Sequence, residues 1–214
     1  MIPLRDSTPS QHFPLVTVLL IAINLYIFYY ETTLGPGIEN FIYLFGMIPA
    51  EFNQYQVSLS ASAYYPFFTS MFLHGSWMHV IGNMWILWLF GDNVEDHMGK
   101  GRFLLFYLLC GLAAGITHYM VNPTSTLPVV GASGAVAGVM GAYFIMFRHA
   151  RVLTLVPPFF LFNFPAWIYL GLWILTQFWY GLIPNNGQIA FWAHIGGFIT
   201  GMLFYRFFLR PQYQ

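Results

Sequence analysis

The sequence carries very little charge. Only 7% of its 214 residues are charged, whereas 58% are hydrophobic and 21% are aromatic. A water-soluble domain has about 25% charged residues, so this composition excludes a soluble globular protein. It also excludes a disordered chain, because disorder requires low hydrophobicity. The class that remains is an integral membrane protein in contact with the lipid bilayer.

Low numbers of other residue types exclude further classes of protein and of active site. Basic and acidic residues number seven each, so no basic excess indicates a nucleic-acid partner. The single cysteine, Cys110, excludes an internal disulfide and cannot hold a metal by itself. The apolar segments contain no HExxH sequence and no Asp or Glu, so zinc hydrolysis and paired-carboxylate proteolysis lack their residues. We therefore expect no metal and no cofactor.

Six apolar segments are long enough to cross a membrane. A hydrocarbon core of about 30 Å requires about 20 residues of helix. Spanning helices are predicted at about residues 13–30, 74–91, 103–121, 131–147, 160–183 and 188–205. Pro165 leaves the start of the fifth helix open. No repeat or linker divides the chain, so residues 1–214 are predicted to form a single all-α membrane domain.

The basic residues predict the orientation of these helices. All seven lie in alternate segments between the predicted helices, namely Arg5, Lys100, Arg102, Arg148, Arg151, Arg206 and Arg210. Because basic residues concentrate on the cytoplasmic side of a membrane, both termini are predicted to be cytoplasmic. The second, fourth and sixth helices then run from the outer face to the inner face.

Few polar side chains lie within the predicted helices, where ionisable groups mark functional sites by default. They are His74, His79, Asn83, His118, Ser133 and His194, together with Asn24, Asn163 and Gln177, which we interpret as helix–helix contacts. His79, Ser133 and His194 lie near the starts of the second, fourth and sixth helices. All three are therefore expected in the outer half of the bilayer, whereas scattered structural residues would not need to share one depth.

Ser133 lies at a predicted junction between a loop and a helix, within Gly131-Ala132-Ser133-Gly134. The first N–H groups of a helix lack intrahelical partners, so they could hold the oxyanion formed when the serine attacks a carbonyl. Taken alone, however, the pattern favours a helix N-cap or a small-residue packing contact.

Two predicted helices carry stripes of small residues, which allow close backbone contact. The stripe of the fourth helix comprises Gly131, Gly134, Gly138 and Gly141, and that of the sixth comprises Gly197 and Gly201. Ser133 and His194 lie at the outer ends of these stripes, so the two helices are predicted to bring them together. Packing alone would explain the glycines, with His194 bonded to a carbonyl, but an ionisable residue in a span favours a functional interpretation.

A second polar pair lies on the second predicted helix. His79 and Asn83 are four residues apart, so they share a helical face and can both donate hydrogen bonds. They could stabilise an oxyanion or only join helices. His74 is five residues before His79, so it is not expected on that face and makes an unconvincing metal pair. No role is assigned to His118.

From about Phe13 to Arg210 the sequence resembles the rhomboid intramembrane serine proteases. The resemblance comprises His74-Gly-Ser-Trp-Met-His79-Val-Ile-Gly-Asn83, the turn from Gly91 through Glu95 to Gly99, the segment Gly131-Ala132-Ser133-Gly134, and Ala193-His194-Ile195-Gly196-Gly197 followed by Gly201. It implies a six-helix bundle with a Ser133–His194 catalytic dyad. His79, Asn83 and the Ser133 N–H would stabilise the oxyanion. The implied substrates are membrane-spanning proteins cut near the outer face, and the expected location is a bacterial inner membrane.

Two departures from the family pattern affect local detail. The family often has an aromatic residue one turn after the serine, where this sequence has Ala137, so another helix is expected to pack against the imidazole. Tyr65 and Pro66 take the place of a Trp-Arg pair in the first outer loop. The loop containing Gly187 is expected to act as a lid over a water-accessible cavity.

Two alternatives stay open at this point. One is a non-enzymatic rhomboid-like module that binds membrane helices and would not need Ser133 beside His194. The other is a transporter or channel that uses the histidines as a proton or metal path. A transporter usually shows inverted repeats and broken helices near the midplane, whereas the polar residues here gather near one face. The sequence predicts no oligomeric state.

Overall fold

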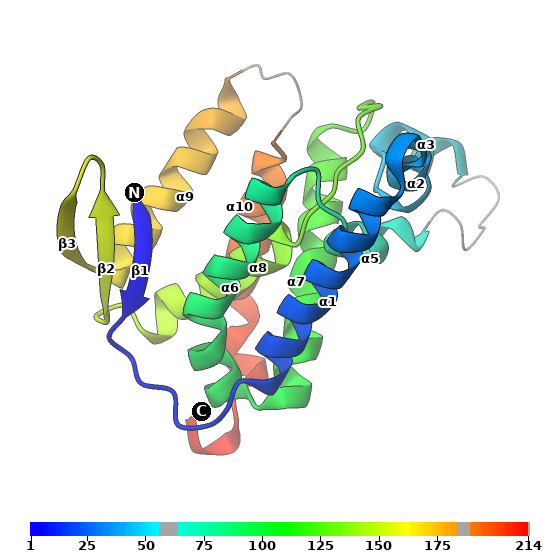
Figure 1. Cartoon of the computed structure of the whole chain (residues 1–214). Helices are drawn as coiled ribbons and strands as arrows, with labels where there is room; N and C mark the ends of the chain where they lie inside the picture. Colours follow the sequence, from blue (N-terminus) through cyan, green and yellow to red (C-terminus); the bar gives the residue numbers. More distant parts are fainter. Residues whose placement is uncertain (56–63, 184–188, 214) are drawn as a thin grey trace.

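The computed structural model describes residues 1–55, 64–183 and 189–213. Its long helices in these ranges are α1 (Leu15–Thr33), α6 (Trp77–Met98), α7 (Lys100–Val121), α8 (Ser133–Met146), α9 (Ala166–Leu182) and α10 (Phe191–Phe208). The shorter helices α2 (Ile38–Phe45), α3 (Pro49–Tyr55) and α5 (Pro66–Thr69) lie between α1 and α6, and 3₁₀ turns occur at Gly35–Gly37, Ser70–Phe72 and Pro211–Tyr213. The long helices pack side by side as one bundle (Figure 1).

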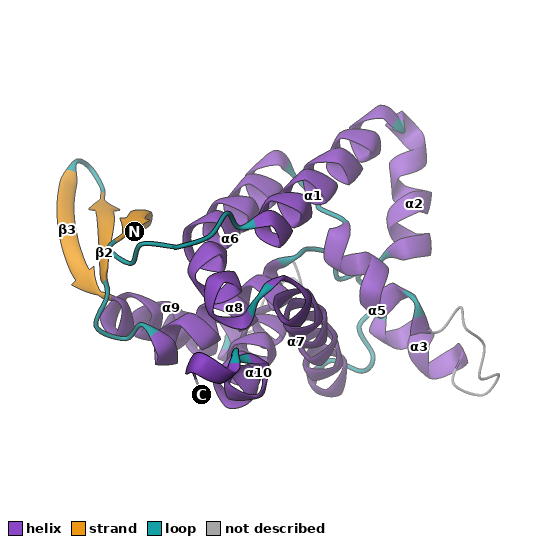
Figure 2. Ribbon diagram, turned by 90° about the horizontal axis from the view of Figure 1, so that it is seen from below, coloured by secondary structure: helices purple, strands orange, loops and turns teal. Residues whose placement is uncertain are grey.

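Helix α8 lies at the centre of this bundle. Residues 134–143 of the helix are all buried, and it contacts α6, α7, α9 and α10 (Figure 2). A helix that is apolar on all sides is stable only when neighbours cover it. Its many small residues allow those neighbours to approach from every direction.

The outer surface of the bundle is rich in large apolar side chains. Exposed examples from several helices include Tyr26, Trp88, Met120, Leu175, Leu203 and Phe207. A soluble monomer rarely exposes apolar surface on this scale, whereas contact with lipid requires it. Among the described helices, α1 and α7 are both long and apolar enough to cross a membrane, and α8 is apolar but shorter. Each long helix overlaps one predicted segment, but six crossings and cytoplasmic termini stay predictions.

The prediction of an all-α protein is wrong in one region. The strands β1 (Ile2–Asp6), β2 (Arg151–Val156) and β3 (Phe160–Pro165) form an antiparallel sheet in the order β1-β2-β3. The fifth helix was predicted to begin at about residue 160, yet α9 begins at Ala166. Pro165 explains the difference, because proline disfavours helical backbone at the preceding residue and is well suited to a helix start.

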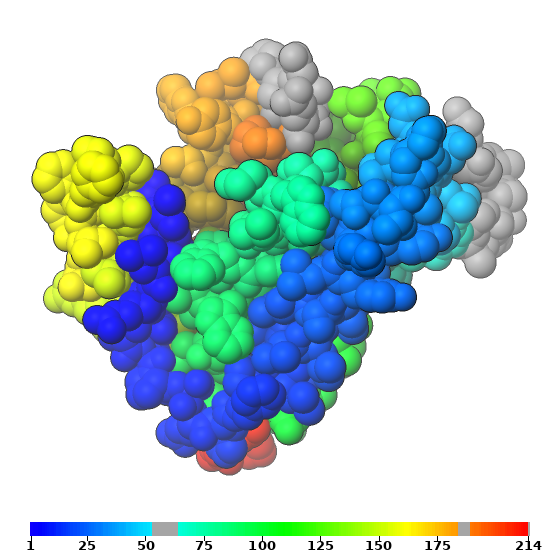
Figure 3. Space-filling model, viewed as in Figure 1, coloured from blue at the N-terminus to red at the C-terminus, as the bar shows by residue number. Residues whose placement is uncertain are grey.

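The sheet lies beside the bundle and joins the N-terminus to it. On the face shown in Figure 3, the N-terminal strand lies between the β2–β3 hairpin and α6. Trp85 of α6 donates from Nε1 to the Pro3 carbonyl at 2.7 Å. The Tyr143 hydroxyl of α8 donates to Asp6 Oδ2 at 2.5 Å. Burial raises the pKa of the Asp6 carboxyl, although the hydrogen bonds from Tyr143 and Thr8 oppose that rise.

Two carboxylates attach α1 to neighbouring structure at both of its ends. Glu95 of α6 accepts hydrogen bonds from the backbone N–H groups of Val16 and Thr17, at 3.0 and 2.8 Å, and from the Thr17 hydroxyl at 2.9 Å. These N–H groups have no partner within α1, and the positive end of the helix dipole favours the carboxylate. Near the other end, Glu31 accepts from the His74 N–H at 3.2 Å. Both ends of α1 are thereby fixed against the segment that carries His74 and His79.

Candidate active site

Ser133 and His194 lie within hydrogen-bond distance of each other. Ser133 is the first residue of α8, and His194 is in the first turn of α10. The distance between His194 Nε2 and Ser133 Oγ is 2.8 Å. A hydroxyl and an imidazole at this distance form the arrangement in which a base can activate a nucleophile.

Close contact between α8 and α10 makes this distance possible. A Cβ atom added to Gly197 would lie 2.0 Å from the Gly134 carbonyl oxygen, and one added to Gly201 would lie 1.9 Å from the Gly138 carbonyl oxygen. A Cβ on Gly141 would lie 2.1 Å from the Phe198 carbonyl oxygen. These obstacles are backbone atoms, so the two helices can approach this closely only with glycine at those positions.

Gly131 differs from the packing role predicted for it. It lies in the loop before α8, not in the helix, and its φ angle is +125°. An added Cβ would lie 2.7 Å from the ring of His79. The absence of a side chain therefore allows the loop to pass close to His79 just before the serine, and a positive φ is available to glycine at little cost.

The four residues to which the sequence assigns a catalytic or oxyanion-stabilising role line one cavity of about 780 Å³. Ser133 and His194 lie on its wall, together with His79 and Asn83 of α6. The rest of the wall includes Met78, Ile86, Met140 and Trp173. A mainly apolar cavity with a few convergent polar groups is the usual form of a binding or active site. Gly187, predicted to belong to a lid, lies outside the described residues.

His74 is a contact of this site that the sequence spacing did not predict. Asn83 Nδ2 is 3.1 Å from His74 Nε2. An amide nitrogen only donates, so the imidazole accepts and one of the two amide hydrogens stays available to the cavity. The sequence spacing does not place His74 and His79 on one helical face, yet their ring centroids lie 5.1 Å apart in the structure. His74 precedes the first residue of α6, so helical spacing does not apply to it.

Helix α9 contributes two further contacts to His194. The indole of Trp173 lies with its centroid 5.9 Å from the imidazole centroid, at an interplanar angle of 32°. Trp173 therefore packs against the imidazole of His194, where Ala137 has no ring to do so. Gln177 Oε1 is 2.8 Å from His194 Nδ1. The sequence indicates only a helix–helix contact for Gln177, and the fold shows that its neighbour on α10 is the histidine.

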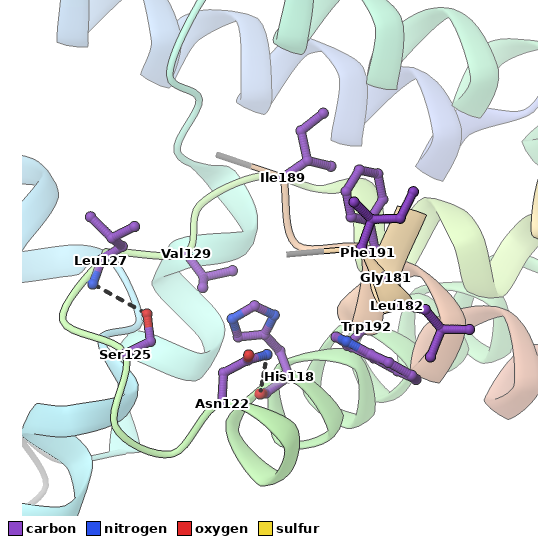
Figure 4. Close-up of a pocket in the computed structure, with 11 residues that line it drawn as sticks. His118, Asn122, Ser125, Leu127, Val129, Gly181, Leu182, Ile189, Phe191 and Trp192 are labelled. Carbon is purple, nitrogen blue, oxygen red and sulfur yellow. Dashed lines mark hydrogen bonds between the residues drawn. The ribbon is translucent and has the colours of Figure 1, made fainter. Parts of the chain in front are cut away.

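A second, smaller pocket of about 290 Å³ adjoins the cavity. Val129 and Ile189 line both spaces. The imidazole of His118 lies among the residues around this pocket, and Asn122 Nδ2 is 3.4 Å from the His118 carbonyl oxygen (Figure 4). Within the part of the chain that the structure describes, His118 joins no group of three His, Cys, Asp or Glu residues that could hold a metal.

Comparisons with known proteins agree with the resemblance in the sequence. The family model described as Rhomboid domain matches residues 61–211, well over half of the chain. Rhomboid protein 1, mitochondrial, from Saccharomyces cerevisiae is 30% identical over 145 residues, which are 63% of this chain and 39% of that protein. Rhomboid protease GluP from Bacillus subtilis is 32% identical over 130 residues, which are 60% of this chain and 24% of that protein.

A third relative bears on the predicted location. Rhomboid-like protein 11, chloroplastic, from Arabidopsis thaliana is 40% identical over 76 residues, which are 36% of this chain and 27% of that protein. The chain thus covers about a quarter to two fifths of the length of these curated relatives. Their names include mitochondrial and chloroplastic proteins, so they support a membrane protein but not specifically the predicted bacterial inner membrane.

Proposed function

Because this chain belongs to the rhomboid family of membrane proteins, we propose that it is an intramembrane serine endopeptidase in which Ser133 is the nucleophile and His194 is the general base. The observation that carries the proposal is the 2.8 Å contact between the two side chains at the wall of a polar-lined cavity. A hydroxyl and an imidazole within hydrogen-bond reach of each other are the arrangement expected for an activated nucleophile and its base.

The proposed reaction is a two-step acyl transfer. Ser133 Oγ attacks the scissile carbonyl carbon while His194 Nε2 takes the hydroxyl proton. His194 then gives that proton to the leaving amine nitrogen as the peptide bond breaks. In the second step His194 takes a proton from water, the resulting hydroxide attacks the acyl carbon, and Ser133 leaves with the proton.

The negative charge that develops on the carbonyl oxygen needs hydrogen-bond donors in the cavity. The proposed donors are the Ser133 backbone N–H, the imidazole of His79 and the amide of Asn83. Ser133 is the first residue of α8, so its N–H belongs to the group that lacks intrahelical partners. The contact between Asn83 and His74 holds the amide in place while leaving one of its hydrogens free.

The proposed substrates are membrane-spanning proteins. Rhomboid proteins act on transmembrane substrates within the membrane, and the apolar surface of the bundle fits that environment. A helical segment hides its peptide bonds in i→i−4 hydrogen bonds, so the substrate must unwind locally before Ser133 can reach a carbonyl. With the proposed six-span orientation, cleavage takes place near the outer face.

Serine reactivity is the first test of this proposal. The purified protein is treated in detergent with a fluorophosphonate probe, beside Ser133→Ala and His194→Ala. We expect the unchanged protein to be labelled and both variants to lose the label. Labelling that persists in Ser133→Ala would mean that another residue reacts. A folded protein that neither takes the label nor cleaves a membrane-spanning reporter would instead be a non-enzymatic module that binds helices.

Substitution of the proposed oxyanion donors tests a separate part of the mechanism. Asn83→Ala and His79→Ala should each lower kcat for a transmembrane reporter about 100- to 1000-fold, the usual loss for one such donor, with a small change in KM. Asn93→Ala is the matched control, because this amide is also on α6 but bonds Asp6 and Asp92. Steady-state cleavage rates measure the effect. A variant at Asn83 with unchanged kcat would remove that residue from the oxyanion site.

A further inference from the structure

Gln177 of α9 is the only described side chain that bonds the far side of the His194 imidazole, with Oε1 at 2.8 Å from Nδ1. We propose that Gln177 is a positioning residue that holds His194 in the Nδ1–H tautomer, so that Nε2 presents its lone pair to Ser133. This inference rests on the proposed function. It adds a third, uncharged member to the Ser133–His194 pair.

The hydrogen bonds of Gln177 determine which way its amide faces. Its Nε2 lies 3.4 Å from the Trp173 carbonyl oxygen and 3.1 Å from Thr176 Oγ1. The carbonyl oxygen can only accept a hydrogen bond, and the Thr176 hydroxyl already donates to that same oxygen at 2.6 Å. Both neighbours therefore accept from Gln177, so the nitrogen faces them and the oxygen faces His194.

The direction of the amide then determines the tautomer of the histidine. Oε1 has no hydrogen, so it must accept from Nδ1, and a neutral imidazole carries only one N–H. Nε2 is consequently unprotonated and accepts the hydrogen bond from the Ser133 hydroxyl. In the other tautomer, Nε2–H would donate to Ser133 Oγ and could not remove its proton.

Gln177 also suits the protonated state formed during the reaction. Nδ1 keeps its hydrogen when Nε2 takes the serine proton, so the bond to Gln177 is retained throughout the cycle. A buried carboxylate at this position would have to be desolvated, whereas a neutral amide avoids that cost. Gln177 is only 8% exposed, and Trp173, one turn before it, packs against the imidazole.

Three variants separate positioning from general packing. Gln177→Met keeps the length of the side chain and removes both polar atoms, whereas Gln177→Glu keeps an acceptor oxygen toward Nδ1. Asn24→Leu is the matched control, because Asn24 is a fully buried helical amide whose Nδ2 bonds the carbonyl four residues earlier, at Leu20. Cleavage of a transmembrane reporter gives kcat and KM separately. Imidazole ¹⁵N chemical shifts, recorded in detergent micelles in the Ser133→Ala background, report the tautomer of His194.

We expect Gln177→Met to lower kcat by about tenfold to a hundredfold, the range for losing a buried hydrogen bond, with KM unchanged. Gln177→Glu keeps an acceptor toward Nδ1 but adds the cost of a buried carboxylate, so its kcat should lie between that of Gln177→Met and that of the unchanged protein. Asn24→Leu should stay within a few fold of the unchanged protein. The ¹⁵N shifts should show one Nδ1–H tautomer with Gln177 present and a mixture in Gln177→Met. An unchanged kcat in Gln177→Met, an equal loss in Gln177→Glu, or a histidine that is Nε2–H with Gln177 in place would each overturn the proposal. The spectra require no turnover, so they decide this inference even if the protein proves not to be a protease.

Discussion

Replacing Ser133 or His194 with alanine is expected to lower the rate of substrate cleavage by on the order of 10⁴-fold or more. The variant that lacks both side chains should be no slower than either single variant. The reason is that the serine attacks only while the histidine removes its proton, so loss of one partner already removes the contribution of the other. Cleavage of a transmembrane reporter, measured for the four proteins that form this double-mutant cycle, gives the comparison.

The cycle needs a histidine variant that leaves the site unchanged. His149 is exposed and bonds the adjacent Arg148, so His149→Ala should cleave the reporter at the rate of the unchanged protein. If the reduction in cleavage rate of the double variant equalled the product of the two single reductions, Ser133 and His194 would be acting independently. That result would contradict the dyad even if each single variant were slow.

Gly201→Ala is expected to destabilise the protein by about 3 kcal/mol or more, above the usual cost of overpacking by a single group. The added methyl group would lie 1.9 Å from the Gly138 carbonyl oxygen, which is backbone and cannot rotate away. Helix α10 would have to move from α8, and the distance between Ser133 and His194 depends on that contact. We therefore expect lower thermal stability in detergent together with reduced fluorophosphonate labelling.

Gly101→Ala provides the matched substitution for this experiment. Gly101 is exposed on α7, and an added Cβ there would meet nothing within 4 Å. Alanine is the better helix former, so this variant should be as stable as the unchanged protein or slightly more stable. Equal melting temperatures for Gly201→Ala and Gly101→Ala would show that the two helices can separate without cost, contrary to the packing described here.

The family and the mainly helical character were accessible from the sequence. Low charge and long apolar segments predicted a membrane protein, and the order of the short motifs predicted the rhomboid family, which the family model confirms. The segments around His79, Ser133 and His194 place these residues near the starts of their helices, as the structure also has them. Such features depend on local composition and helical period, which the sequence contains directly.

The sheet and the start of the fifth helix were not predicted. Residues 160–165 are apolar enough to be predicted as part of a helix. The periodicity of a short apolar run cannot by itself distinguish a strand from a helix. Their pairing with β2, and the pairing of β2 with β1 from the opposite end of the chain, provide hydrogen bonds that no local pattern reveals. Pro165 indicated a boundary but not the strand before it.

The sequence by itself determined which reactive side chains the protein has and which helical faces can approach closely. Only the tertiary structure decided their partners, such as Gln177 and Trp173 for His194, or His74 for Asn83. The physical reason is that a polar side chain in a helix can bond its own backbone or any neighbour within reach. Which of these it meets depends on how far α8, α9 and α10 are turned and shifted against one another, and that is a property of the packed bundle.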